Sequence, residues 1–102
     1  MRFAIPHDHP ALPGHFPGRP VVPGVVVLDR VYAAIEAAYG PLGATYLPQV
    51  KFVRPLSPGE RAQVVLDGAA PRWRFRVQCE DGALVASGEV ASVEATGPQA
   101  PA

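Results

Sequence analysis

The side chains best suited to moving protons at neutral pH are three histidines, and all lie near the start of the sequence: His7, His9 and His15. They share the first 23 residues with six prolines, which exclude regular helix there and predict an extended, stiff loop. A carboxylate, Asp29, follows soon after the last histidine. A histidine and a carboxylate can act together as general base and general acid, so His15 and Asp29 are the first candidates for chemistry.

Gly24 opens a segment without proline that predicts one helix from Gly24 to Tyr39, with Pro23 at the entry position and Gly40 as the stop. The unpaired N–H groups at a helix start favour developing negative charge, which makes Gly24 a candidate oxyanion site. Asp29 follows about 7.5 Å along the helix axis, among apolar residues. Partial burial there would raise the pKa of its carboxyl group and make it a usable proton donor.

Plainer interpretations of the same residues stay open. Asp29 and Glu36 are seven residues apart and share a helix face, which also fits an ordinary solvated stripe. His15 also fits a surface or structural histidine. His7 and His9 invite a metal site, but His15 is the only further histidine or cysteine near them in sequence, so no metal is expected.

The rest of the chain predicts an α+β fold. The helix is apolar on nearly every face, which is typical of a helix surrounded by protein. Segments with a period of two, separated by turn residues, predict strands at 3–5, 47–53, 62–66, 72–78 and 84–93. We therefore expect an antiparallel sheet curled around one central helix. Since so short a chain buries little surface, dimerisation is the natural way to cover the helix.

Composition limits the class of protein. The 102 residues are 48% hydrophobic and 18% charged with zero net charge, so we expect one domain over residues 1–93, a flexible tail at 94–102, and no nucleic-acid partner. No apolar stretch is long enough to span a membrane. The single cysteine, Cys79, excludes an internal disulfide, and we expect a cytoplasmic protein in which it packs in or beside the sheet.

A basic row is predicted on one strand. Arg72, Arg74 and Arg76 alternate with apolar residues, so the three guanidinium groups share one face of the strand. Such a row could receive an acidic partner, or it could be an ordinary solvated face.

The segment from His15 to Asp29, HFPGRPVVPGVVVLD, resembles the active-site segment of the hotdog-fold β-hydroxyacyl-acyl-carrier-protein dehydratases. In that family a histidine precedes Phe-Pro-Gly, a second Pro-Gly opens the central helix, and an acid lies in the helix. The segments 51–60 (KFVRPLSPGE) and 86–90 (ASGEV) extend the resemblance, which covers about residues 12 to 93. The aspartate and the short length are most similar to the small dehydratases of aryl polyene and related pigment pathways.

The resemblance implies a role for each site residue. His15 would be the base that removes the proton alpha to the thioester, and Asp29 would help to expel the 3-hydroxyl as water. The N–H of Gly24 would polarise the thioester carbonyl, and the Val21 carbonyl would orient the imidazole. Pro23 and Val25 would complete the substrate-binding set around Gly24.

The resemblance also implies partners and an assembly. The substrate would be a (3R)-hydroxyacyl chain on acyl carrier protein, converted to a trans-2-enoyl thioester without a metal or redox cofactor. Histidine and acid would meet across the interface of a homodimer, or of a heterodimer with another hotdog subunit. The aspartate-bearing branch commonly has a glutamine at the position of Ala33, which leaves the polar partner of Asp29 undefined. A hotdog thioesterase and an inactive hotdog subunit that binds the carrier or an active partner are the alternatives.

Overall fold

The computed structural model of the chain describes residues 1–10 and 21–93. It contains one helix, α1 (Gly24–Tyr39), and five strands: β1 (Arg2–Phe3), β2 (Thr45–Phe52), β3 (Ala62–Ala69), β4 (Arg72–Cys79) and β5 (Leu84–Ser92). His15 and the tail expected at 94–102 lie outside the described residues.

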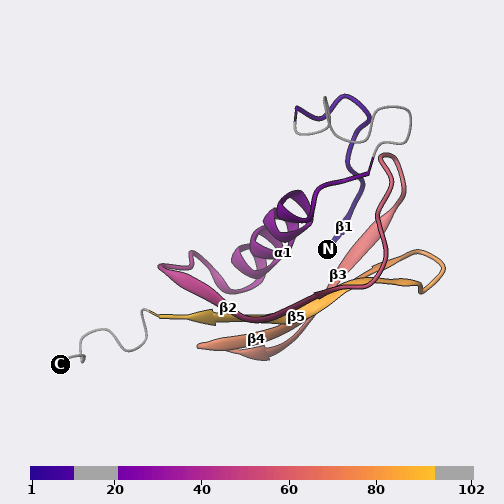
Figure 1. Ribbon diagram of the computed structural model, residues 1–102. Coiled ribbons are helices and arrows are strands. Elements are labelled where there is room, and N and C mark those ends of the chain that lie inside the picture. Colours follow the sequence, from indigo (N-terminus) through magenta and orange to yellow (C-terminus); the bar gives the residue numbers. More distant parts are fainter. Residues whose placement is uncertain (11–20, 94–102) are drawn as a thin grey trace.

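The five strands form one antiparallel sheet in the order β1-β3-β4-β5-β2, and α1 lies along one face of it (Figure 1). The two edge strands differ in length. β1 pairs only Arg2 and Phe3 with β3, whereas β2 follows β5 for most of its eight residues. This arrangement confirms the predicted α+β architecture. In the described ranges, no helix has the length and apolar character that crossing a membrane requires.

The bounds of α1 follow from local sequence, as expected. Pro23 has φ −60° and ψ 147°, an extended conformation that presents its carbonyl to the first helical turn, where it accepts the N–H of Val26 at 3.0 Å. Gly40 ends the helix with φ 93°, a value that costs glycine little, and its N–H still donates to the Glu36 carbonyl at 2.9 Å. The predicted range Gly24 to Tyr39 is therefore confirmed.

The core lies between α1 and the inner face of the sheet. Alternation along β4 buries Trp73, Phe75 and Val77 and leaves the three arginines of that strand exposed, as the period of two predicts. On the helix, one face is buried against the sheet, through Val26, Val27, Val31, Ala34 and Ile35. The opposite face is open in the protomer, so the expectation of a helix enclosed on all sides is not met within a single chain.

Strand ends differ from the sequence prediction by one residue at the ends of β2, β4 and β5, and by more in three places. The first strand is Arg2–Phe3 rather than 3–5, because Ile5 leaves the sheet and is buried in the core. β2 begins earlier, at Thr45, and accommodates Pro48 through a register shift between Tyr46 and Gln49. β3 continues to Ala69 instead of ending at Leu66.

The longer β3 reflects a tighter turn than the sequence suggested. Gly68 pairs with Trp73 and Ala69 pairs with Arg72, so only Ala70 and Pro71 remain for the connection. Cross-strand pairing thus includes residues that composition alone assigned to a turn.

Candidate functional site

The start of α1 has the features of an open anion-stabilising position. Pro23 has no side chain that could cap the helix, and the first turn contains no acidic residue. Val26 and Val27 both donate their N–H groups to the Pro23 carbonyl. Among the residues that the structure describes, the N–H groups of Gly24 and Val25 have no acceptor, so both are free to meet negative charge.

A groove of about 420 Å³ lies against this helix start. Such a volume falls within the range of small-molecule sites. The walls come from the segment before α1, from its first turn, from the end of β2 and the following loop, and from β5. The lining residues are Val21, Val22, Gly24, Val27, Phe52, Val53, Arg54, Pro55, Leu56 and Val85.

Phe52 lies directly over Gly24. A Cβ atom at position 24 would be 2.8 Å from Cζ of Phe52, closer than real Cβ contacts allow, so the absence of a side chain permits the ring to approach the helix start. The ring is nevertheless 51% exposed, because β2 is the edge of the sheet. Gly24 and Phe52 therefore bring the first turn of the helix and the edge strand together.

Asp29 lies one turn beyond Val25, on the open face of the helix. Both residues are exposed, and Val25 is 65% accessible. The partial burial expected for Asp29 is therefore absent in the single protomer, because nothing in the chain covers this face. Glu36 is exposed on the helix as well, and Ala33, in the position that is glutamine in the similar branch, is half-buried.

His15 lies outside the described residues, so its relation to Gly24 and Asp29 stays a prediction. Of the other predicted residues, the structure brings Val21 and Gly24 together as lining of the groove. Pro23 and Val25 are their chain neighbours at the helix start. No group of three or more histidine, cysteine or acidic residues within 1–10 and 21–93 is arranged to hold a metal ion.

A polar cluster that sequence reasoning missed holds the loop behind the groove. Nη2 of Arg54 lies 2.9 Å from Oε2 of Glu60, and Nη1 donates to Sγ of Cys79 at 3.5 Å. The Cys79 thiol donates to Oε2 of Glu60 at 3.2 Å, and the other carboxylate oxygen accepts the Ser57 N–H at 3.1 Å. These bonds tie the loop between β2 and β3 to the end of β4.

Hydrogen bonds and burial shift the pKa values of Arg54, Glu60 and Cys79. The hydrogen bond from the Ser57 N–H is the main cause that lowers the pKa of Glu60, with smaller contributions from Cys79 and Arg54. Burial is the main cause that raises the pKa of the Cys79 thiol, followed by the adjacent Glu60 carboxylate. The Glu60 hydrogen bond raises the pKa of Arg54. At neutral pH the cluster therefore contains a guanidinium, a carboxylate and a neutral thiol.

Part of this cluster had a sequence signal. Ser57 and Glu60 are three residues apart around Pro58-Gly59, a spacing that allows the carboxylate to accept the serine N–H across a turn. The contacts to Cys79, by contrast, depend on how the loop lies against β4. Phe52 had no signal as a neighbour of Gly24, because that contact joins two elements distant in sequence.

The basic row lies on the outer face of the sheet, opposite to the helix. Arg72 Nη1 is 2.9 Å from Oε1 of Glu89, and Arg74 Nε is 4.0 Å from Oε2 of the same carboxylate. Within the described ranges, Arg76 has no ion pair. Glu89 thus partly offsets the positive charge of Arg72 and Arg74, whereas the charge of Arg76 is not offset by an acidic side chain in the described ranges.

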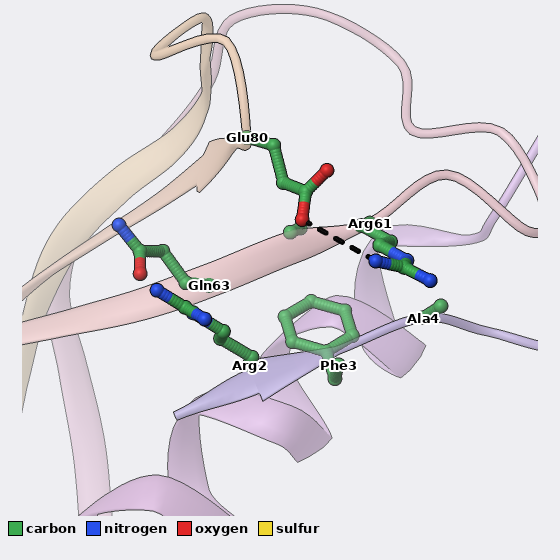
Figure 2. Close-up of a pocket in the computed structure, with 7 residues that line it drawn as sticks. Arg2, Phe3, Ala4, Arg61, Gln63 and Glu80 are labelled. Carbon is green, nitrogen blue, oxygen red and sulfur yellow. Dashed lines mark ion pairs between the residues drawn. The ribbon is translucent and has the colours of Figure 1, made fainter.

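A second pocket lies at the other edge of the sheet, next to β1, and holds none of the predicted residues. Figure 2 shows the Phe3 ring on its floor, and an ion pair across its rim joins Arg61 Nη1 to Glu80 Oε2 at 3.7 Å. Both partners are largely exposed, and such pairs contribute about 0–1 kcal/mol. The pocket is therefore a surface feature away from the start of α1.

One helix against an antiparallel sheet, with an uncapped helix start facing a groove at the sheet edge, defines a hotdog-type α+β protein, and solved structures share this fold. Over 88% of the chain it superposes on 81% of a chain of the dehydratase heterocomplex ApeI:P from Xenorhabdus doucetiae, with a TM-score of 0.75 and 22% identity. It also matches an uncharacterized protein from Erwinia carotovora subsp. atroseptica, with a TM-score of 0.71, 24% identity, and coverage of 91% and 82% of the two chains.

Sequence comparison defines the family. Residues 1–89 match the ApeI-like family model, described as ApeI dehydratase, so the chain belongs to this family of dehydratases. It is 34% identical over 100 residues to 3-hydroxyacyl-[acyl-carrier-protein] dehydratase FabZ of Thiobacillus denitrificans, covering 81% of this chain and 68% of the relative. The FabZ of Sorangium cellulosum is 30% identical over 100 residues, with 84% and 64% covered. The chain thus spans about two thirds of the length of these relatives.

Proposed function

We propose that this protein dehydrates (3R)-hydroxyacyl thioesters carried on acyl carrier protein to trans-2-enoyl thioesters. The observation that carries the proposal is the helix start at Gly24: Gly24 lines a groove of suitable size, and its N–H has no acceptor among residues 1–10 and 21–93. Family membership supports the reaction class, since relatives that share about a third of the sequence are named 3-hydroxyacyl-[acyl-carrier-protein] dehydratases.

In the proposed reaction His15 takes the proton from the carbon alpha to the thioester. The electron pair left behind spreads onto the thioester oxygen, which accepts the Gly24 N–H, and then forms the double bond as the C–O bond of the 3-hydroxyl breaks. Asp29 supplies the proton with which the hydroxyl leaves as water. The Val21 carbonyl orients the imidazole, and Pro23 and Val25 shape the surface around the thioester.

The exposed position of Asp29 supports a site completed by a second subunit. Val25 and Asp29 are open on the helix, and Phe52 and Val53 are about half exposed at the adjacent sheet edge. A partner that covered this surface would remove apolar side chains from water and enclose the carboxylate. We therefore propose a dimer, formed with a second copy or with another hotdog subunit, as the active form.

The carrier protein and the location of the reaction belong to the same proposal. The outer arginines Arg72, Arg74 and Arg76 offer positive charge for an acidic carrier, with Arg76 the least neutralised. A cytoplasmic location fits a reaction on carrier-bound acyl chains.

The test is product analysis with matched helix variants. Purified protein is given a 3-hydroxyacyl carrier protein, and the enoyl thioester is followed by ultraviolet absorbance and mass spectrometry. Asp29→Asn should lower the rate at least about 100-fold, in the range of a lost general acid. Glu36→Gln, which removes another exposed carboxylate of α1, should leave the rate within about twofold of wild type.

Other outcomes of this experiment would contradict the proposal and favour a different function. Free carrier thiol instead of enoyl product would indicate a thioesterase. No turnover at several chain lengths, alone or with an active hotdog partner, would indicate an inactive subunit. Equal rates for Asp29→Asn and wild type would remove Asp29 from the mechanism.

A further inference from the structure

Two prolines limit backbone hydrogen bonding in the connection between β2 and β3. This connection, residues 53–61, is bonded to the sheet at its start, where Val53 donates its N–H to the Val85 carbonyl at 2.8 Å. Further along, Pro55 and Pro58 have no N–H to donate. Because a regular ladder of backbone bonds is excluded at these positions, the shape of the connection depends on side chains.

The Glu60 carboxylate holds the connection at three points. One oxygen accepts the Ser57 N–H at 3.1 Å, and the other accepts Nη2 of Arg54 at 2.9 Å and the Cys79 thiol at 3.2 Å. The Glu60 side chain is 27% exposed, so these bonds are partly shielded from water and are stronger than those of a fully solvated pair. One carboxylate therefore fixes the connection to itself and to the end of β4.

The connection in turn holds the segment before α1. Val22, two residues before Gly24, donates its N–H to the Leu56 carbonyl at 2.8 Å. Both side chains are buried, with 4% of Val22 and 1% of Leu56 exposed. The groove is lined by the segment before α1 and by residues 53–56, so this bond joins two of its walls.

A second bond attaches the N-terminal segment to the same turn. Gly59 donates its N–H to the carbonyl of Ile5 at 2.8 Å, and Ile5 is fully buried. A Cβ atom at position 59 would lie 2.8 Å from Nε2 of His7, so the imidazole lies directly over the glycine. The turn from Leu56 to Gly59 is therefore the attachment point of two segments that precede α1.

From these contacts we infer that Glu60 is a positioning residue for the candidate site. Its bond to the Ser57 N–H holds the Leu56 carbonyl in place for the Val22 N–H. The position of Val22 in turn sets where Gly24 presents its N–H to the groove. Glu60 itself is not among the residues that line the groove, so it acts through the backbone and not on the substrate. This inference rests on the proposed function and adds a residue to it.

The chemistry proposed at Gly24 is sensitive to such positioning. A displacement of about 1 Å in a reacting geometry can cost about 100-fold in rate. The bond from the Gly24 N–H to the thioester oxygen strengthens as negative charge develops, so its misplacement lowers kcat and leaves KM nearly unchanged. A purely structural residue would lower stability and leave the kcat of the folded protein as it is.

Amide hydrogen exchange, followed by NMR, tests the contact without reference to activity. In Glu60→Ala the Val22 amide should exchange at least about tenfold faster than in wild type, relative to the amide of Val77 in the central strand β4. The ratio to Val77 corrects for a general loss of stability. Glu80→Gln is the matched control, because it removes an exposed carboxylate that pairs with Arg61, and it should leave the ratio unchanged.

Kinetics with a 3-hydroxyacyl carrier protein test the consequence for the site. Glu60→Ala should lose about 10- to 100-fold in kcat, with KM within about threefold of wild type. Glu60→Gln keeps an oxygen that can accept the Ser57 N–H, so it should recover part of this loss. Val90→Ala, a cavity in β5 away from the groove lining, should be less stable than wild type but keep its kcat within about twofold.

The outcomes separate this inference from the proposed function. An unchanged exchange ratio in Glu60→Ala would overturn the inference, and so would a faster Val22 amide with unchanged kcat. If wild type forms no enoyl product, the dehydratase proposal alone is contradicted. The exchange ratio then still decides whether Glu60 holds Val22 in place.

Discussion

Gly88 should be among the least replaceable residues of the sheet, because the backbone of β2 passes so close to it that no side chain fits between them. A Cβ atom at position 88 would lie 3.0 Å from Cα of Val50 and 3.1 Å from the carbonyl carbon of Gln49, and nearer still to the Gln49 oxygen. Ordinary carbon contacts are about 3.5–4.0 Å, so Gly88→Ala must move β2 outward by about 0.5–1 Å. The atoms in the way belong to backbone, which cannot rotate aside as a side chain would.

The expected cost combines overpacking with weakened hydrogen bonds. Overpacking typically costs about 1–3 kcal/mol and each weakened hydrogen bond about 1 kcal/mol, so Gly88→Ala should lower the free energy of unfolding by about 2–4 kcal/mol. Urea unfolding at one fixed protein concentration measures it, because association would otherwise alter the apparent stability.

Ser87→Ala is the matched control, since it changes the neighbouring residue of β5 without adding an atom. It should change the free energy of unfolding by less than about 0.5 kcal/mol. A Gly88→Ala protein as stable as this control would refute the close approach of the β2 backbone to Gly88.

Three further predictions concern the polar cluster and the basic row. Because hydrogen bonds lower the pKa of Glu60 in the folded state, its stabilising contribution is present above its unfolded pKa of about 4.3 and is lost as pH falls through the folded value. Urea midpoints should therefore fall less between pH 6 and pH 3 for Glu60→Gln than for wild type, with Glu80→Gln behaving as wild type. Burial raises the pKa of the Cys79 thiol, so iodoacetamide at pH 8 should label it at least about tenfold more slowly in folded than in urea-unfolded protein, and equal rates would contradict its burial. Arg76→Glu should raise KM for carrier-bound substrate several-fold and leave turnover of a small pantetheine thioester unchanged, whereas an unchanged KM would assign the row to an ordinary solvated face.

Local sequence signals predicted the ends of the helix, but they did not predict the ends of all strands. Pro23 and Gly40 act within one or two residues, so the ends of α1 could be read directly from the sequence. The end of β3 could not, because Gly68 continues a strand only when Trp73 is there to pair with it. The same distinction explains Ile5, which has the composition of a strand residue but is buried beneath other elements.

Some residues of the candidate site could likewise be found from local sequence, and others only from the folded structure. Gly24 and Asp29 were found from their spacing on one helix. The Phe52 contact and the cluster of Arg54, Glu60 and Cys79 join segments that only the folded sheet brings together. The exposure of Asp29 agrees with the solvated stripe that stayed open for Asp29 and Glu36, and not with the partial burial expected of a proton donor. An apolar helix sequence does not tell whether its cover comes from the same chain or from a second one.

The most direct test of the proposed dehydration is the rate of enoyl-thioester formation from a 3-hydroxyacyl carrier protein by wild type, His15→Ala and His7→Ala. If His15 is the base, its variant should lose at least about 100-fold in rate while remaining folded and dimeric, and His7→Ala should stay within about twofold of wild type. Enoyl product formed equally fast by His15→Ala would contradict the account, because no base would then be assigned to remove the alpha proton.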